Sequence, residues 1–193
     1  MKRNKPKYHQ IIDAAVIAIA ENGYHAAQVS KIAKRAGVAD GTIYLYFKNK
    51  EDILISLFQE KMQNFVENLE KVVAGKQKAA EKLLLMLENH FTILSDDRHL
   101  AVVTQLELRQ SNKELRLKIN NVLKDYLKLI EKILSEGVES GEFKSDLNIR
   151  ITRQMIFGTI DEIVTTWVMN DQKYDLVALA PTVSKLLMSG LSA

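Results

Sequence analysis

Very little in this chain would stop a helix. Its 193 residues include two prolines, at positions 6 and 181, and eight glycines. Apolar residues recur at spacings of three and four, and no alternating pattern long enough for a strand appears. This periodicity predicts an all-α fold of about nine helices.

Caps and helix-ending residues predict where these helices begin and end. We expect a first helix over residues 7–22, two short helices within 29–47, and a long helix over 50–72 capped by Asn49. The remaining helices are expected at 78–95, 100–109, 111–139, 149–169 and 174–190. A capping box of Ser111 and Glu114 would open the helix that runs to Glu139.

Residues 29–47 have the pattern of a helix-turn-helix. Gly37 stands where a left-handed residue ends the first short helix, and Asp40 is placed to cap the second. Ile43 and Phe47 share the apolar face of that second helix. Its other faces carry hydrogen-bonding side chains, namely Thr42, Tyr44 and Tyr46. This arrangement predicts a recognition helix that binds DNA.

Charge is distributed unevenly along the chain. The net charge is +3, but residues 1–50 hold nine Lys or Arg against three acids. Residues 51–193 hold eighteen bases and twenty-one acids. A concentration of positive charge around the helix-turn-helix favours contact with phosphates over an ordinary solvated basic surface.

The segment 32–54, IAKRAGVADGTIYLYFKNKEDIL, resembles the DNA-binding signature of the TetR family of bacterial repressors. One departure is Gln28, where family members usually carry Thr as a cap, and Gln caps poorly. The resemblance implies an N-terminal three-helix DNA-binding head and a C-terminal helical body for ligand binding and dimerisation. We place the boundary so that residues 1–50 form the head and 51–193 the body.

Candidate DNA contacts follow from side-chain chemistry within the head. Thr42 can read a base edge or a thymine methyl group, and Ala39 and Gly41 let the backbone approach closely. The other candidates bind phosphate, namely Lys31, Arg35, Tyr44, Tyr46, Lys48 and Lys50. A basic arm of Lys2, Arg3, Lys5 and Lys7 precedes them.

The helix over 149–169 is apolar on more than one face, so it should be buried on two sides. Similarity to TetR proteins implies that this helix and the one over 174–190 form a four-helix bundle between two subunits. We therefore expect a homodimer, with Trp167 at or near the interface. The alternative is a core helix that is buried wholly within one subunit.

Polar residues interrupt two apolar helices of the body. Arg109 follows Gln105 and Glu107, and such an arginine must reach solvent, a carboxylate or an anionic ligand. Arg153, Asp161 and Glu162 interrupt the helix over 149–169. A structural ion pair between Arg109 and one of these acids is an equally good explanation.

The same segments, with TTWVMNDQKYDLVAL at 165–179, resemble the branch of the family that regulates fatty-acid degradation in bacilli. That resemblance implies repression of β-oxidation genes and release from DNA by a long-chain acyl-CoA, which acts as effector and not as cofactor. The candidate ligand-binding residues are His90, Gln105, Arg109, Arg153, Phe157 and Trp167. Arg109 and Arg153 are the candidates for the coenzyme A phosphates.

Other classes find less support. The chain has no cysteine, no His-Glu-x-x-His spacing and no phosphate-loop or nucleophile-elbow motif, so neither a metal site nor an enzyme is expected. Its longest apolar run is too short to span a membrane, which indicates a cytoplasmic protein with no membrane partner. Two alternatives remain: a sensor of cationic or aromatic drugs that uses Glu107, Asp161 and Glu162, and a DNA architectural protein without sequence preference.

Overall fold

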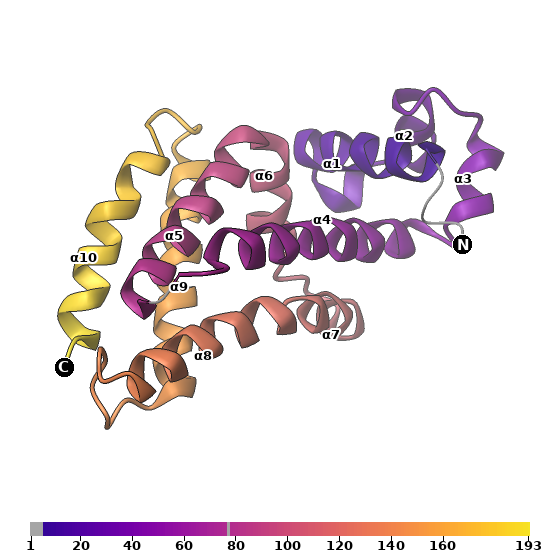
Figure 1. The fold of residues 1–193 in the computed structure, drawn as a ribbon. Coiled ribbons are helices and arrows are strands. Elements are labelled where there is room, and N and C mark those ends of the chain that lie inside the picture. The colour runs from indigo at the N-terminus through magenta and orange to yellow at the C-terminus, as the bar shows by residue number, and fades with distance from the viewer. Residues whose placement is uncertain (1–5, 77) are drawn as a thin grey trace. The chain divides into compact units, whose positions relative to one another are not determined.

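The computed structural model describes residues 6–76 and 78–193, and these form ten α-helices and one short 3₁₀ helix (Figure 1). The α-helices are α1 (Pro6–Ala26), α2 (Val29–Arg35), α3 (Asp40–Tyr46), α4 (Lys50–Val73), α5 (Ala79–Asp96), α6 (Arg98–Glu107), α7 (Lys113–Val122), α8 (Lys124–Glu139), α9 (Ile149–Met169) and α10 (Ala180–Leu191), with η1 (Val177–Leu179) before α10. The predicted all-α class is confirmed. Lys2, Arg3 and Lys5 of the expected basic arm lie outside the described residues.

The chain divides into two compact units. The head unit runs from the start of the described chain to Met62 and includes Arg98–Val122, and the body unit comprises Gln63–Asp97 and Leu123–Ala193. The helices α6 and α7 therefore group with the helix-turn-helix, although they lie beyond α5 in the sequence. The functional boundary at residue 50 is a different kind of division and stays a prediction.

Within the head unit, α1 packs against α2 and α6, and α2 packs against α3. The turn after α2 ends as the sequence predicts, because Gly37 has φ 64° and the Val38 amide donates to Ala33 O at 3.0 Å. Gln28 is the N-cap of α2 and its side chain makes no capping hydrogen bond. Asp40 is not a cap: it is the first residue of α3, after Ala39, where its charge still favours the helix dipole.

The predicted helix over 111–139 is wrong in two respects. It is interrupted at Leu123, between α7 and α8, which is where the chain passes from the head unit to the body unit. Its N-cap is Asn112, which accepts from the Leu115 amide at 3.0 Å, and not Ser111. With Asn112 as the N-cap, Glu114 stands at the second and not the third helical position, so no capping box forms, and its carboxylate pairs with Lys118 at 2.6 Å.

Within the body unit, α5 packs against α8 and α10, and α8 packs against α9. The last helix begins at Ala180 rather than 174, because Pro181 cannot donate a helical hydrogen bond and fits only in a first turn. Buried apolar residues of α5, α8 and α9 form the core, including Leu83, Met86, Leu87, Phe91, Ile130, Ile156, Ile160, Val164 and Trp167. No helix of the described chain is long and apolar enough to cross a membrane.

Candidate nucleic-acid interface and effector site

The recognition helix α3 exposes two large side chains. Ile43 is 1% exposed and Phe47 is buried against Tyr8, with ring centroids 5.1 Å apart, whereas Tyr44 is 58% and Leu45 is 64% exposed. Buried Ile43 and Phe47 fix the orientation of α3, so the opposite side faces solvent. An exposed tyrosine and leucine side by side form a surface that suits a partner.

Leu45 is a candidate that sequence reasoning missed. It lies next to Tyr44 and can make apolar contact with a thymine methyl group in the major groove. The signal was available, because Leu45 falls outside the face defined by Ile43 and Phe47. A leucine in a helix is nevertheless usually assigned to a core.

The remaining head candidates lie on α2, on α3 and in the residues just before α3 and α4. Lys31, Ala39, Gly41 and Lys48 are exposed, and Thr42 and Tyr46 are partly exposed. A Cβ on Gly41 would meet nothing within 4 Å, so the first turn of α3 is open to a close approach. Arg35 pairs with Glu21, but the pair is exposed and weak enough for the arginine to exchange onto a phosphate. All of these DNA contacts stay predictions.

Lys50 makes contacts inside the head that the sequence did not reveal. Its Nζ donates to Tyr24 O and His25 O, each at 2.9 Å, and lies 4.7 Å from the centroid of the Tyr24 ring. The ammonium group therefore holds the end of α1 next to the start of α4. Its predicted phosphate contact would have to share the ammonium with these two carbonyl groups.

Two ligand candidates of the body unit, His90 and Phe157, contact Tyr126 of α8, and a third, Arg153, pairs with another residue of α8. His90 Nδ1 lies 3.0 Å from the Tyr126 hydroxyl, and the ring centroids of Tyr126 and Phe157 are 6.2 Å apart. Arg153 stands one turn before Phe157 on α9 and donates to Glu131 Oε1 at 2.6 Å. The carboxylate that pairs with Arg153 is thus Glu131, which the sequence did not indicate. The contact between Tyr126 and His90 depends on the packing of α8 against α5.

His90 is held in its neutral form. Its ring packs against Phe65, with centroids 4.9 Å apart, and burial lowers the pKa of His90 to about 3. Burial also raises the pKa of Tyr126. A neutral His90 can form a hydrogen bond with the Tyr126 hydroxyl without placing a charge in this aromatic cluster.

The neutral His90 predicts a pH dependence of stability. Because its pKa is lower in the folded chain than its usual value of 6.5, the unfolded chain takes up the proton first as the pH falls. We expect the free energy of unfolding to fall by about 1–2 kcal/mol more in the wild type than in His90→Gln between pH 7 and pH 5, after discounting for the partial exposure of the residue. Urea unfolding at both pH values measures this, and equal losses in the two proteins would contradict it.

The other three ligand candidates lie elsewhere. Trp167 is fully buried within the subunit, and its Nε1 donates to Tyr174 O at 2.8 Å. A side chain already covered by its own core adds no contact area to a subunit interface, so the prediction that Trp167 lies at or near that interface stays a prediction about its position alone. Gln105 is buried and Arg109 is exposed, and both belong to the head unit. Their ligand roles stay predictions.

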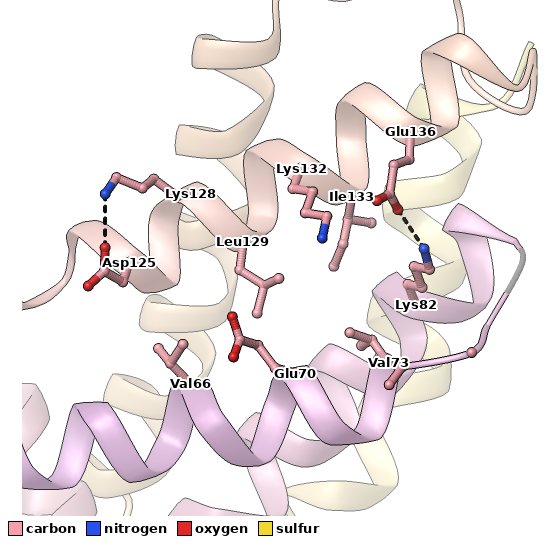
Figure 2. A pocket seen from close by; sticks show the side chains of 12 residues that line it. Val66, Glu70, Val73, Lys82, Asp125, Lys128, Leu129, Lys132, Ile133 and Glu136 are labelled. Atoms are coloured by element: carbon pink, nitrogen blue, oxygen red, sulfur yellow. Dashed lines mark hydrogen bonds and ion pairs between the residues drawn. The ribbon is translucent and has the colours of Figure 1, made fainter.

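A pocket of about 500 Å³ opens between α4 and α8 in the body unit (Figure 2). Its apolar residues are Val66, Val73, Ala74, Leu129 and Ile133. Lys128 pairs with Asp125 at 2.9 Å, and Lys82 pairs with Glu136. Lys132 has no ion-pair partner among the described residues, and its ammonium group is directed into the pocket in Figure 2. No sequence signal pointed to this pocket, because its walls come from separate helices.

An exposed recognition helix on an all-helical chain defines a DNA-binding transcription regulator of the helix-turn-helix class. Residues 11–57 match the family described as bacterial regulatory proteins, tetR family, and residues 58–190 match the C-terminal region of YsiA-like proteins. The chain belongs to the TetR family. This is a family of transcription regulators, in agreement with the prediction that the chain is not an enzyme.

A sequence relative and two solved structures support a narrower assignment within this family. The chain is 67% identical over 191 residues to a fatty acid metabolism regulator protein of Bacillus subtilis, a match that covers 99% of this chain and 98% of the relative. It is also similar to the crystal structure of FadR from Bacillus subtilis in complex with stearoyl-CoA, with a TM-score of 0.93 and 68% identity over 95% of this chain and 98% of that one. FadR from Bacillus halodurans has a TM-score of 0.93 and 62% identity, over 95% of this chain and 99% of that one.

Proposed function

We propose that this chain is a cytoplasmic transcriptional repressor that binds a palindromic operator as a homodimer and leaves it on binding a long-chain acyl-CoA. The genes under its control would be those of fatty-acid degradation. The observation that carries the proposal is the 67% identity to a fatty acid metabolism regulator over both the helix-turn-helix and the body. A match limited to the head would support DNA binding alone.

Exposed apolar side chains on α9 and α10 support the dimer. Ile151, Met155 and Met169 of α9 are 51%, 64% and 62% exposed, and Leu186 of α10 is 70% exposed. Large apolar side chains in such numbers on two adjacent elements of the sequence are expected to be covered by another molecule. A second copy of the same two helices would cover them with a self-complementary surface.

The two parts of an acyl-CoA require different surroundings. Its acyl chain needs an apolar channel, and its phosphates need cationic side chains. Arg153 already pairs with Glu131, so it is a less available phosphate ligand than the sequence suggested. Lys132 is directed into the pocket between α4 and α8, whose lining combines apolar residues with the carboxylate of Glu70, and it is our preferred candidate for the anionic part.

The proposal is tested by competition for operator DNA. An operator duplex is selected by the protein from a random pool, and its binding is followed by fluorescence anisotropy with oleoyl-CoA, free oleate or a cationic dye added. Release by oleoyl-CoA alone is the expected result. Release by the dye alone would instead identify a drug sensor, and release by none of the three would contradict the acyl-CoA effector.

Lys132→Ala tests whether Lys132 binds the phosphate groups of the acyl-CoA. We expect the oleoyl-CoA concentration for half-release to rise about fivefold, the equivalent of about 1 kcal/mol for one partly exposed charge contact. Lys124→Ala is the matched control, because Lys124 is an exposed lysine on the same helix that does not line the pocket. Equal half-release concentrations for the two variants would exclude Lys132 from the effector site.

A further inference from the structure

The helix α1 is broken three residues before its end. Gly23 has φ 75° and ψ 154°, which is not helical and which side chains rarely adopt. The amide that follows, that of Tyr24, donates to Glu107 Oε1 at 2.8 Å, across 83 residues of sequence. A buried amide at a helix break needs an acceptor, and here a carboxylate of α6 provides it.

The same short stretch is held from a second side. Lys50 at the start of α4 donates to the carbonyl oxygens of Tyr24 and His25, so the peptide groups around Tyr24 have their donor and acceptors occupied by side chains of other helices. Tyr24 itself is only 6% exposed. Three residues separate His25 from Val29, where α2 begins. Tyr24 therefore lies close in sequence to the start of the helix-turn-helix.

Glu107 is pre-positioned for this contact. Gln110, which is 5% exposed, donates its side-chain amide to the second carboxylate oxygen of Glu107, and Gln110 O accepts from Arg116 Nη1 at 2.8 Å. Glu107 is also the last residue of α6, where a negative charge is unfavourable for the helix dipole. At this position the Glu107 carboxylate does not stabilise α6. It is instead placed to accept a hydrogen bond from the Tyr24 amide.

We propose that Glu107 is a positioning residue for operator binding. Its carboxylate accepts from the Tyr24 amide and so fixes the helix-turn-helix on α6, within the head unit. A displacement of α6 would be carried to α2 and α3 through this hydrogen bond. This proposal rests on the proposed function because its test measures binding to operator DNA, but it does not depend on the identity of the effector.

The test compares three variants in the absence of any effector. Glu107→Ala removes the acceptor, and we expect the dissociation constant for the operator duplex to rise about tenfold. Glu107→Gln retains an oxygen that can accept from Tyr24, so its dissociation constant should stay within about threefold of the wild-type value. Glu114→Ala is the control, because Glu114 is an exposed acid of the same unit whose one ion-pair partner among the described residues is Lys118.

Wild-type affinity of Glu107→Ala, or equal losses in the alanine and glutamine variants, would overturn the proposal. If Glu107→Ala fails to fold, amide hydrogen exchange of the wild type decides: the Tyr24 amide must be protected, and exchange at the rate of an unfolded chain would overturn the contact. Failure of oleoyl-CoA to release the operator would reject the effector without affecting these results, because all are obtained without it.

Discussion

Ile43→Asp is expected to abolish operator binding by unfolding the helix-turn-helix. Ile43 is 1% exposed and is the buried residue within α3, so its replacement by Asp removes apolar contacts and buries a charge. The cost should be about 4 kcal/mol or more, which is a large part of the stability of a small unit.

Leu45→Asp is the matched control for Ile43→Asp. The substitution is the same and lies two residues further along the same helix, but Leu45 is 64% exposed. We expect this variant to keep a wild-type thermal melt by circular dichroism while it loses affinity for the operator. A native melt and undiminished operator binding of Ile43→Asp would show that α3 is not held by this contact.

Leu186→Asp is expected to separate the two subunits and with them most of the operator affinity. Leu186 is 70% exposed in the protomer, so its replacement should not affect the fold of one chain. At an interface with two-fold symmetry, however, the substitution places a charge on both sides of the apolar contact. A single subunit binds one half-site only, and we expect operator affinity to fall about a hundredfold or more.

Sedimentation velocity and operator titration measure the effect of Leu186→Asp. Leu117→Asp is the control, because Leu117 is 57% exposed on α7, outside the two helices expected to form the dimer. The control should remain dimeric. A dimeric Leu186→Asp with wild-type operator affinity would place the subunit interface on another surface.

Features that depend on a few neighbouring residues could be predicted from the sequence. The all-helical class follows from apolar spacing, and the turn after α2 follows from Gly37. The cap of α4 is another example, because Asn49 Oδ1 accepts from the Asp52 amide at 2.8 Å as expected. Each of these is a local choice, made within one or two helical turns.

Pairings between distant residues were decided by the tertiary structure alone. The sequence did not indicate that the Lys50 ammonium contacts two carbonyl groups of α1, or that the Trp167 indole donates to Tyr174 O inside the core. Glu107 reaches Tyr24 only because α6 lies along α1. Periodicity defines which face of a helix is apolar, whereas the partner of each polar side chain depends on which helix is placed against it.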